Sequence, residues 1–114
     1  MNEQEKNQYN ARARVIKAMG HPSRLFMVDQ LQKGPLCVCE LTEMVGADTS
    51  TVSKHLSVLK NAGLVYDQRE GNTVYYHLRV PCVLDFLNCV DSVLEVNMDE
   101  QIRIVRSCQA KNIS

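Results

Sequence analysis

The sequence predicts a winged helix-turn-helix fold, mostly α-helical with one β-hairpin, and three observations favour it. Two segments with helical spacing of apolar residues are separated only by the turn Gly46-Ala47-Asp48. The second segment opens with hydroxyl side chains and ends near Gly63. Beyond it, two stretches rich in Val, Tyr and Thr flank Gly71-Asn72, as the strands of a hairpin do. Helix, turn, helix and hairpin in this order are typical of that fold.

The two ends of the chain are expected to be helical and to form a dimer interface. The segment from Asn7 to Met19 carries apolar side chains at helical spacing: Ala11, Val15, Ala18 and Met19. Pro81 stands where a C-terminal helix would begin. That helix has two adjacent apolar rows: Val83, Leu87, Val90 and Leu94, and Cys82, Phe86, Cys89, Val93 and Val96. Because one small domain does not readily cover two such rows, we expect residues 1–114 to form a single domain that associates as a homodimer.

The central pair of helices follows from the same spacing. The segment from Leu36 to Val45 is predicted to be the first helix of the pair, and the stretch from Thr49 to Val65 contains the second. One face of the second helix must be buried, because its apolar residues recur there: Val52, Leu56 and Leu59. Hydroxyl oxygens at its start are expected to cap the helix: Thr49, Ser50 and Thr51. Gly63 is expected to end it.

The other face of the second helix is polar and suited to contact double-stranded DNA. Hydroxyl, ammonium and imidazole groups reach phosphates and base edges. The candidate contacts on this helix are Thr49, Ser50, Thr51, Ser53, Lys54, His55, Ser57 and Lys60. His55 has the alternative of a hydrogen bond inside the domain. The hairpin, Leu64 to Glu70 and Thr73 to Leu78, would act as a wing, where Arg69 and Thr73 either contact DNA or are solvated.

The charge of the chain is consistent with DNA binding only if it is localised. The net charge is zero, from 13 basic and 13 acidic residues. Residues 49–79 are locally basic, with Lys54, Lys60, Arg69 and Arg79 against Asp67 and Glu70. A second basic group has no acid between its members: Arg12, Arg14, Lys17 and Arg24. That group either contacts phosphates or forms a solvated helix face.

A pair of cysteines just upstream of the DNA-reading helix is the candidate metal site. Cys37 and Cys39 lie in the stretch LCVCEL, and thiolates are soft donors that suit thiophilic ions. Residues two apart on an ideal helix are rotated by about 200°, so shared chelation requires a loose first turn or a distortion of it. Of the remaining thiols, Cys82 and Cys89 lie on an apolar stripe where packing competes with ligation, and Cys108 has no assigned role.

Four segments together resemble the ArsR/SmtB family of metal-responsive bacterial repressors, over about Val15 to Leu78. They are AMGHPSRLFMVDQL, LCVCEL, VSKHLSVLKNAGLV and REGNTVYYHL. The resemblance implies a homodimeric winged helix-turn-helix protein that represses its operator until an inducer binds. LCVCEL is similar to the inducer-binding segment of the arsenic and cadmium/lead sensors, which implies As(III) or Sb(III), or alternatively Cd(II) or Pb(II), and no organic cofactor.

The sequence departs from that pattern at one position. In sensors with this motif a third cysteine often follows three residues after the second, and here that residue is Thr42. Water, an exogenous thiol, or one of Cys82, Cys89 and Cys108 would have to complete a three-coordinate site. A zinc site of the kind found on the C-terminal helix in other members is disfavoured, because that helix has Asp85 and Asp91 but no His.

The same residues bear on other functional classes and on the cellular location of the chain. A repressor of this fold that senses thiol oxidation or persulfide is the alternative. A thiol enzyme is disfavoured, because Cys-X-Cys is not the Cys-X-X-Cys redox spacing. Without a long apolar run, the chain is expected to be cytoplasmic, with no membrane contact. Two symmetric helices would read an operator with an inverted repeat.

Overall fold

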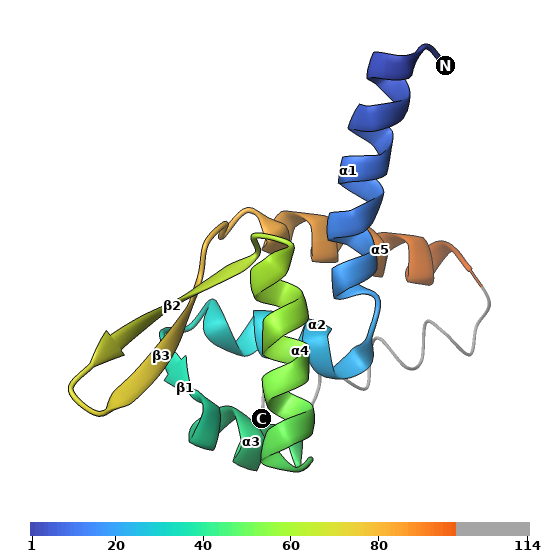
Figure 1. The fold of residues 1–114 in the computed structure, drawn as a ribbon. Coiled ribbons are helices and arrows are strands. Elements are labelled where there is room, and N and C mark those ends of the chain that lie inside the picture. The colour runs from blue at the N-terminus through green and yellow to red at the C-terminus, as the bar shows by residue number, and fades with distance from the viewer. Residues whose placement is uncertain (98–114) are drawn as a thin grey trace. The chain divides into compact units, whose positions relative to one another are not determined.

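The computed structural model describes residues 1–97. The elements are α1 (Glu3–Met19), α2 (Pro22–Leu31), β1 (Leu36–Cys37), α3 (Val38–Val45), α4 (Thr49–Asn61), β2 (Val65–Glu70), β3 (Thr73–Leu78) and α5 (Val83–Val96). Residues Met1–Pro81 form one compact unit, and α5 belongs to a second unit that begins at Cys82. The winged helix-turn-helix fold predicted from the sequence is confirmed within the first unit (Figure 1).

Helix α1 begins four residues earlier than its apolar spacing predicted. Asn2 caps it by accepting a hydrogen bond from the Glu5 N–H at 2.8 Å, and the Glu5 carboxylate accepts from the Asn2 N–H at 3.2 Å. Only Ala18 and Met19 of α1 are buried, at its C-terminal end. Figure 1 shows the rest of α1 extending away from the other elements of this unit. Most of α1 is therefore free to contact another molecule.

The core of the first unit lies between α2, α3 and α4. The predicted buried face of α4 is confirmed, because Val52, Leu56 and Leu59 are all fully buried. They share this core with Met27 and Val28 of α2 and with Leu41 of α3, which are also fully buried. The turn between α3 and α4 depends on Gly46, whose φ of 76° is left-handed and whose N–H donates to the Thr42 carbonyl at 3.0 Å.

The sheet has three strands in the order β1-β3-β2, all antiparallel. Strands β2 and β3 form the predicted hairpin, in which Glu70 pairs with Thr73 across Gly71-Asn72. Strand β1 was not predicted: the sequence suggested that a helix begins near Leu36, whereas Leu36 pairs with Tyr76 and Cys37 with Tyr75. Helix α3 begins only at Val38. The segment before α3 is thus hydrogen-bonded to the wing.

Helix α5 confirms the predicted C-terminal helix and is described by itself. It begins directly after Cys82 and leaves several large apolar side chains exposed: Phe86, Val90, Val93 and Val96. Such an exposed apolar row is typical of a surface that pairs with a second chain, as the predicted homodimer requires. Within residues 1–97, no helix is both long enough and apolar enough to span a membrane.

Candidate DNA-reading surface and thiol site

Helix α4 is capped by Asp48 and not by the hydroxyl groups that follow it. Asp48 Oδ1 accepts hydrogen bonds from the Thr51 N–H at 2.7 Å and from the Ser50 hydroxyl at 2.8 Å. The Thr51 N–H and then the two hydroxyl groups lower the pKa of Asp48, so its carboxylate stays charged. The predicted capping role of Thr49, Ser50 and Thr51 is therefore wrong. Thr49, the first residue of α4, is exposed.

A stripe of four polar residues runs along α4 and is called here the polar stripe: Ser50, Ser53, Lys54 and Ser57. Their spacing of three and four residues places them on one face of the helix. Ser50, Lys54 and Ser57 are exposed, and Ser53 is half-buried. The buried row at Val52, Leu56 and Leu59 lies on the opposite face of α4. Packing of that row in the core therefore orients the polar stripe toward solvent. Thr51, at the edge of the stripe, is half-buried.

His55 lies beside the polar stripe but has partners inside the unit. The Arg24 guanidinium donates from Nη1 to His55 Nδ1 at 3.1 Å and from Nε to the Ala18 carbonyl. Because a guanidinium cannot accept, His55 must be neutral with its proton on Nε2. The His21 ring lies 4.4 Å from the His55 ring, centroid to centroid. Arg24 thus joins the end of α1 to the middle of α4.

His21 itself caps α2, because its Nδ1 accepts from the Ser23 N–H at 3.1 Å. The contact between His21 and His55 therefore connects the start of α2 to the DNA-reading helix. The sequence left His55 open between DNA contact and an internal hydrogen bond, and the hydrogen bond to Arg24 favours the internal role.

We expect acidification to weaken the fold through His55. Burial, followed by the charges of His21 and Arg24, lowers the pKa of His55 below its ordinary value of 6.5. The unfolded chain therefore binds this proton at a higher pH than the folded chain. The contribution of His55 to the free energy of unfolding should be complete above pH 6.5, its ordinary pKa. It should decrease as the pH is lowered from there through the pKa of the folded state. Urea denaturation at a series of pH values would measure the fall, and a His55→Gln variant should reduce it. An equally steep fall in that variant would contradict the assignment.

The remaining candidate DNA contacts are divided between the wing and the far end of α4. Arg69 is exposed on β2, and Thr73 is half-buried at the start of β3, so both lie at the tip of the hairpin. Lys60 lies in the last turn of α4 and forms an ion pair with Asp67 of β2 at 3.0 Å. This contact joins α4 to the wing, and it lies at the opposite end of the helix from Thr49.

The two candidate metal ligands lie on either side of a strand-to-helix junction. Cys37 has an extended backbone, with φ −87° and ψ 168°, and serves as the N-cap of α3, whereas Cys39 lies in its first turn. The angular separation of two helical residues therefore does not apply to the pair. The Glu40 carboxylate accepts from both the N–H of Cys37, at 3.3 Å, and its Sγ–H, at 3.1 Å. Cys37 is half-buried and Cys39 is exposed, so both thiols are accessible.

The other thiols do not complete a site in the part of the chain that is described. Cys82 and Cys89 are free and exposed, and Cys108 lies outside residues 1–97. Over that range no three His, Cys, Asp or Glu side chains are grouped to hold a metal ion. Thr42, at the position where a third cysteine was considered, has a buried hydroxyl oxygen without a hydrogen-bond partner among the described residues.

Comparisons with known proteins agree with this geometry. Residues 21–67 match the family described as "Bacterial regulatory protein, arsR family". The HTH-type transcriptional regulator NmtR of Mycobacterium tuberculosis is 44% identical over 58% of the chain, which spans 55% of that relative. The arsenic resistance transcriptional regulator ArsR1 of Pseudomonas putida is 37% identical over 75% of the chain and 67% of its own length.

A solved structure extends the similarity to the fold. The homodimeric winged helix-turn-helix DNA-binding domain of a possible ArsR-family regulator from Mycobacterium bovis superposes with a TM-score of 0.74 at 29% identity. The match covers 85% of this chain and 94% of that one.

Proposed function

Because the chain belongs to the arsR family of bacterial regulatory proteins, we propose that it is a cytoplasmic, homodimeric repressor released from its operator by As(III) or Sb(III) at Cys37 and Cys39. The chain is a transcriptional regulator with a DNA-binding fold, and it is not an enzyme. One observation carries the choice of site. Cys37 belongs to β1, caps α3 and pairs with Tyr75 of the wing, so a ligand there acts on three parts of the DNA-reading unit at once.

The DNA-reading surface would consist of the start of α4 and the tip of the wing. The polar stripe, with Thr49 and Thr51, enters the major groove, while Arg69 and Thr73 reach the flanking backbone. Two copies related by a two-fold axis would present two such helices, which fits an operator with an inverted repeat. The homodimeric relative from Mycobacterium bovis and the exposed apolar residues of α5 support the dimer.

The thiol pair has the right chemistry for a trivalent metalloid. Each As–S bond forms as a thiol loses its proton and arsenite loses a hydroxide, and the two leave together as water. Loss of the Cys37 proton removes the hydrogen bond from Sγ to Glu40, which lies in the first turn of α3. Two negative or electron-rich groups then face each other at the N-cap. Metalloid binding would therefore displace Glu40 and loosen the start of α3.

This displacement offers a route to the DNA-reading surface. Helix α3 leads through the Gly46 turn into α4, and β1 is paired with β3 of the wing. A change at Cys37 would alter the orientation of both elements relative to the core. Coupling between an inducer and DNA of this kind is typically worth about 1–3 kcal/mol. Cd(II) and Pb(II) are alternative ligands for the same thiols.

Direct titration of the reduced protein tests the site without knowledge of the operator. Arsenite and Cd(II) are added separately while the near-ultraviolet absorption of sulfur-to-metal bonds is followed. Saturable absorption that disappears in a Cys37→Ser, Cys39→Ser variant and persists in a Cys82→Ser, Cys89→Ser variant would support the proposal. No absorption in the wild-type protein would reject it and favour the thiol-oxidation or persulfide alternative, since all four described thiols are free.

A Thr42→Cys variant should bind arsenite more tightly, by about tenfold, which corresponds to about 1.4 kcal/mol. Position 42 is three residues beyond Cys39 and on the same face of α3, so a thiol there adds a third sulfur. The buried Thr42 hydroxyl has no partner in the described residues, and a cysteine thiol tolerates burial better. Competition with a dithiol chelator measures the gain. A Thr42→Ser variant is the matched control, and equal affinity of the two variants would contradict a site centred on α3.

A further inference from the structure

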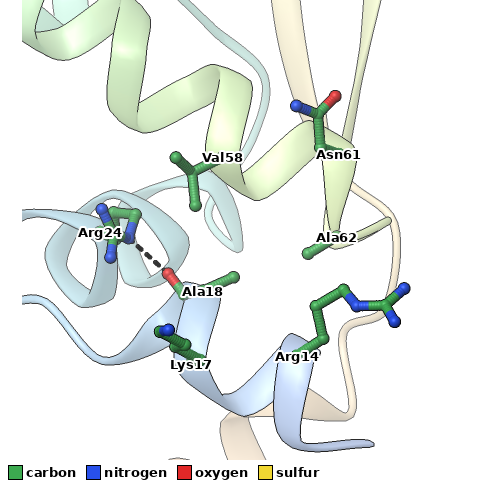
Figure 2. A pocket seen from close by; sticks show the side chains of 7 residues that line it. All are labelled: Arg14, Lys17, Ala18, Arg24, Val58, Asn61 and Ala62. Carbon is green, nitrogen blue, oxygen red and sulfur yellow. Dashed lines mark hydrogen bonds between the residues drawn. The ribbon is translucent and has the colours of Figure 1, made fainter. Parts of the chain in front are cut away.

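A pocket at the C-terminal end of the DNA-reading helix carries chemistry that the proposed thiol site does not use. It has a volume of about 320 Å³ and lies between the C-terminal half of α1, the start of α2 and the last turns of α4 (Figure 2). Its walls are apolar, formed by Ala18, Val58 and Ala62. Its polar groups are three cations and one amide: Arg14, Lys17, Arg24 and Asn61.

The cations of this pocket are not neutralised by nearby carboxylates. No acidic residue lines it, and in the part of the chain that the structure covers the one ion pair is Lys60 with Asp67, outside the pocket. Figure 2 shows Arg24 and Lys17 at one end of the pocket and Arg14 and Asn61 at the other, with the apolar side chains between them. Three cations without a carboxylate partner at the edge of an apolar surface attract an anion.

We propose that this pocket binds a small organic anion, with a carboxylate or phosphate group attached to an apolar body. The volume falls within the range of about 300–1,000 Å³ typical of small-molecule sites. Guanidinium and ammonium groups form strong charge-assisted hydrogen bonds with carboxylate and phosphate oxygens. The apolar body would pack against Val58 and Ala62, while Asn61 supplies an amide for orientation.

Occupation of the pocket would affect the DNA-reading helix through Arg24. This side chain lines the pocket and donates to His55 in the middle of α4 and to the Ala18 carbonyl at the end of α1. An anion competes with His55 for the guanidinium, and a contact with Val58 and Asn61 acts on the same helix directly. The anion therefore serves as a second effector, distinct from the thiol ligand, and lowers the affinity for DNA.

The test is a titration of the full-length chain, free of DNA and metal, followed by ¹⁵N–¹H correlation spectra. The probes are benzoate and phenyl phosphate, with benzamide as the uncharged counterpart. Saturable shifts of the Lys17, Ala18 and Ala62 amides by the two anions but not by benzamide are expected. An Arg14→Gln, Lys17→Gln variant should bind at least about tenfold more weakly. Arg12→Gln, on the same helix and outside the pocket, should bind like the wild type.

Several outcomes would overturn the proposal. They are the absence of saturation at tens of millimolar probe, equal shifts with benzamide, or unchanged affinity in the Arg14→Gln, Lys17→Gln variant. A further one is weaker dimerisation of that variant in sedimentation, without any anion-dependent shift. That result would indicate that the pocket binds the acidic first turn of α1 from a second copy, which contains Glu3 and Glu5. Because the Cys37→Ser, Cys39→Ser variant should retain anion binding, failure of the thiol proposal and failure of this one are distinguishable.

Discussion

Replacement of Cys37 and Cys39 by serine should abolish release from DNA by arsenite while leaving DNA binding intact. Neither thiol belongs to the buried core, and a serine hydroxyl at position 37 can still donate to Glu40, so the junction between β1 and α3 should persist. In the wild-type protein, saturating arsenite should weaken operator affinity by about 5- to 150-fold, the usual range of such couplings. In the double variant the ratio of the two affinities should be close to one.

Fluorescence anisotropy of a labelled duplex, first selected from a random-sequence library, would measure both affinities. A Cys82→Ser, Cys89→Ser variant is the matched control, because it removes the same number of exposed thiols and leaves the α3 junction unchanged. Retention of the arsenite effect in the Cys37→Ser, Cys39→Ser variant would reject the assigned site. Loss of the effect in the control variant instead would move the inducer site to α5.

The helices and the hairpin were predictable because their signals are local. The apolar spacing of Val52, Leu56 and Leu59 fixed both the existence of α4 and its buried face, and the residues around Gly71-Asn72 fixed the register of the wing. A local signal was also available for the true start of α1, since Asn2 and Glu5 have the spacing of a capping box. It was missed because the first turns of α1 contain no apolar row.

The parts that escaped prediction depend on contacts between residues distant in sequence. Strand β1 contains only Leu36 and Cys37, and it exists because Tyr75 and Tyr76 of β3 pair with them. From sequence alone, the helical spacing of apolar residues from Leu36 to Val45 favoured a helix that begins near Leu36. The choice of Asp48 as the cap of α4 over the adjacent hydroxyls was a matter of geometry that spacing cannot decide.

The hydrogen bonds of Arg24 also could not be predicted from the sequence. Arg24 appeared in the sequence only as one of several basic residues, whereas in the structure it joins Ala18 to His55 across three helices. The thiol pair shows the reverse case. The sequence identified Cys37 and Cys39 as a pair, but the objection from helix geometry disappears only when Cys37 is seen to have an extended backbone.

Removal of the central groups of the polar stripe should weaken operator binding by about ten- to a hundredfold. In a Ser53→Ala, Lys54→Ala variant the helix retains its buried row and its Asp48 cap, so the fold should persist. The variant would lose the proposed DNA contacts of one hydroxyl and one ammonium, and each good contact to a base is worth about 1–3 kcal/mol. Loss of the ammonium should also reduce the slope of log affinity against log salt by about one.

A Lys60→Ala variant is the control for this helix. It removes the same charge from α4, but at the end that pairs with Asp67 of the wing and away from the start of the helix. We expect its salt slope to stay close to that of the wild type, because an ammonium held by a carboxylate displaces few counterions from DNA. Anisotropy titrations at several salt concentrations separate the two variants. Lys60→Ala could instead lose as much affinity and as much salt slope as the Ser53→Ala, Lys54→Ala variant. The DNA-contacting surface would then have to extend along the whole of α4, and DNA rather than Asp67 would position the wing.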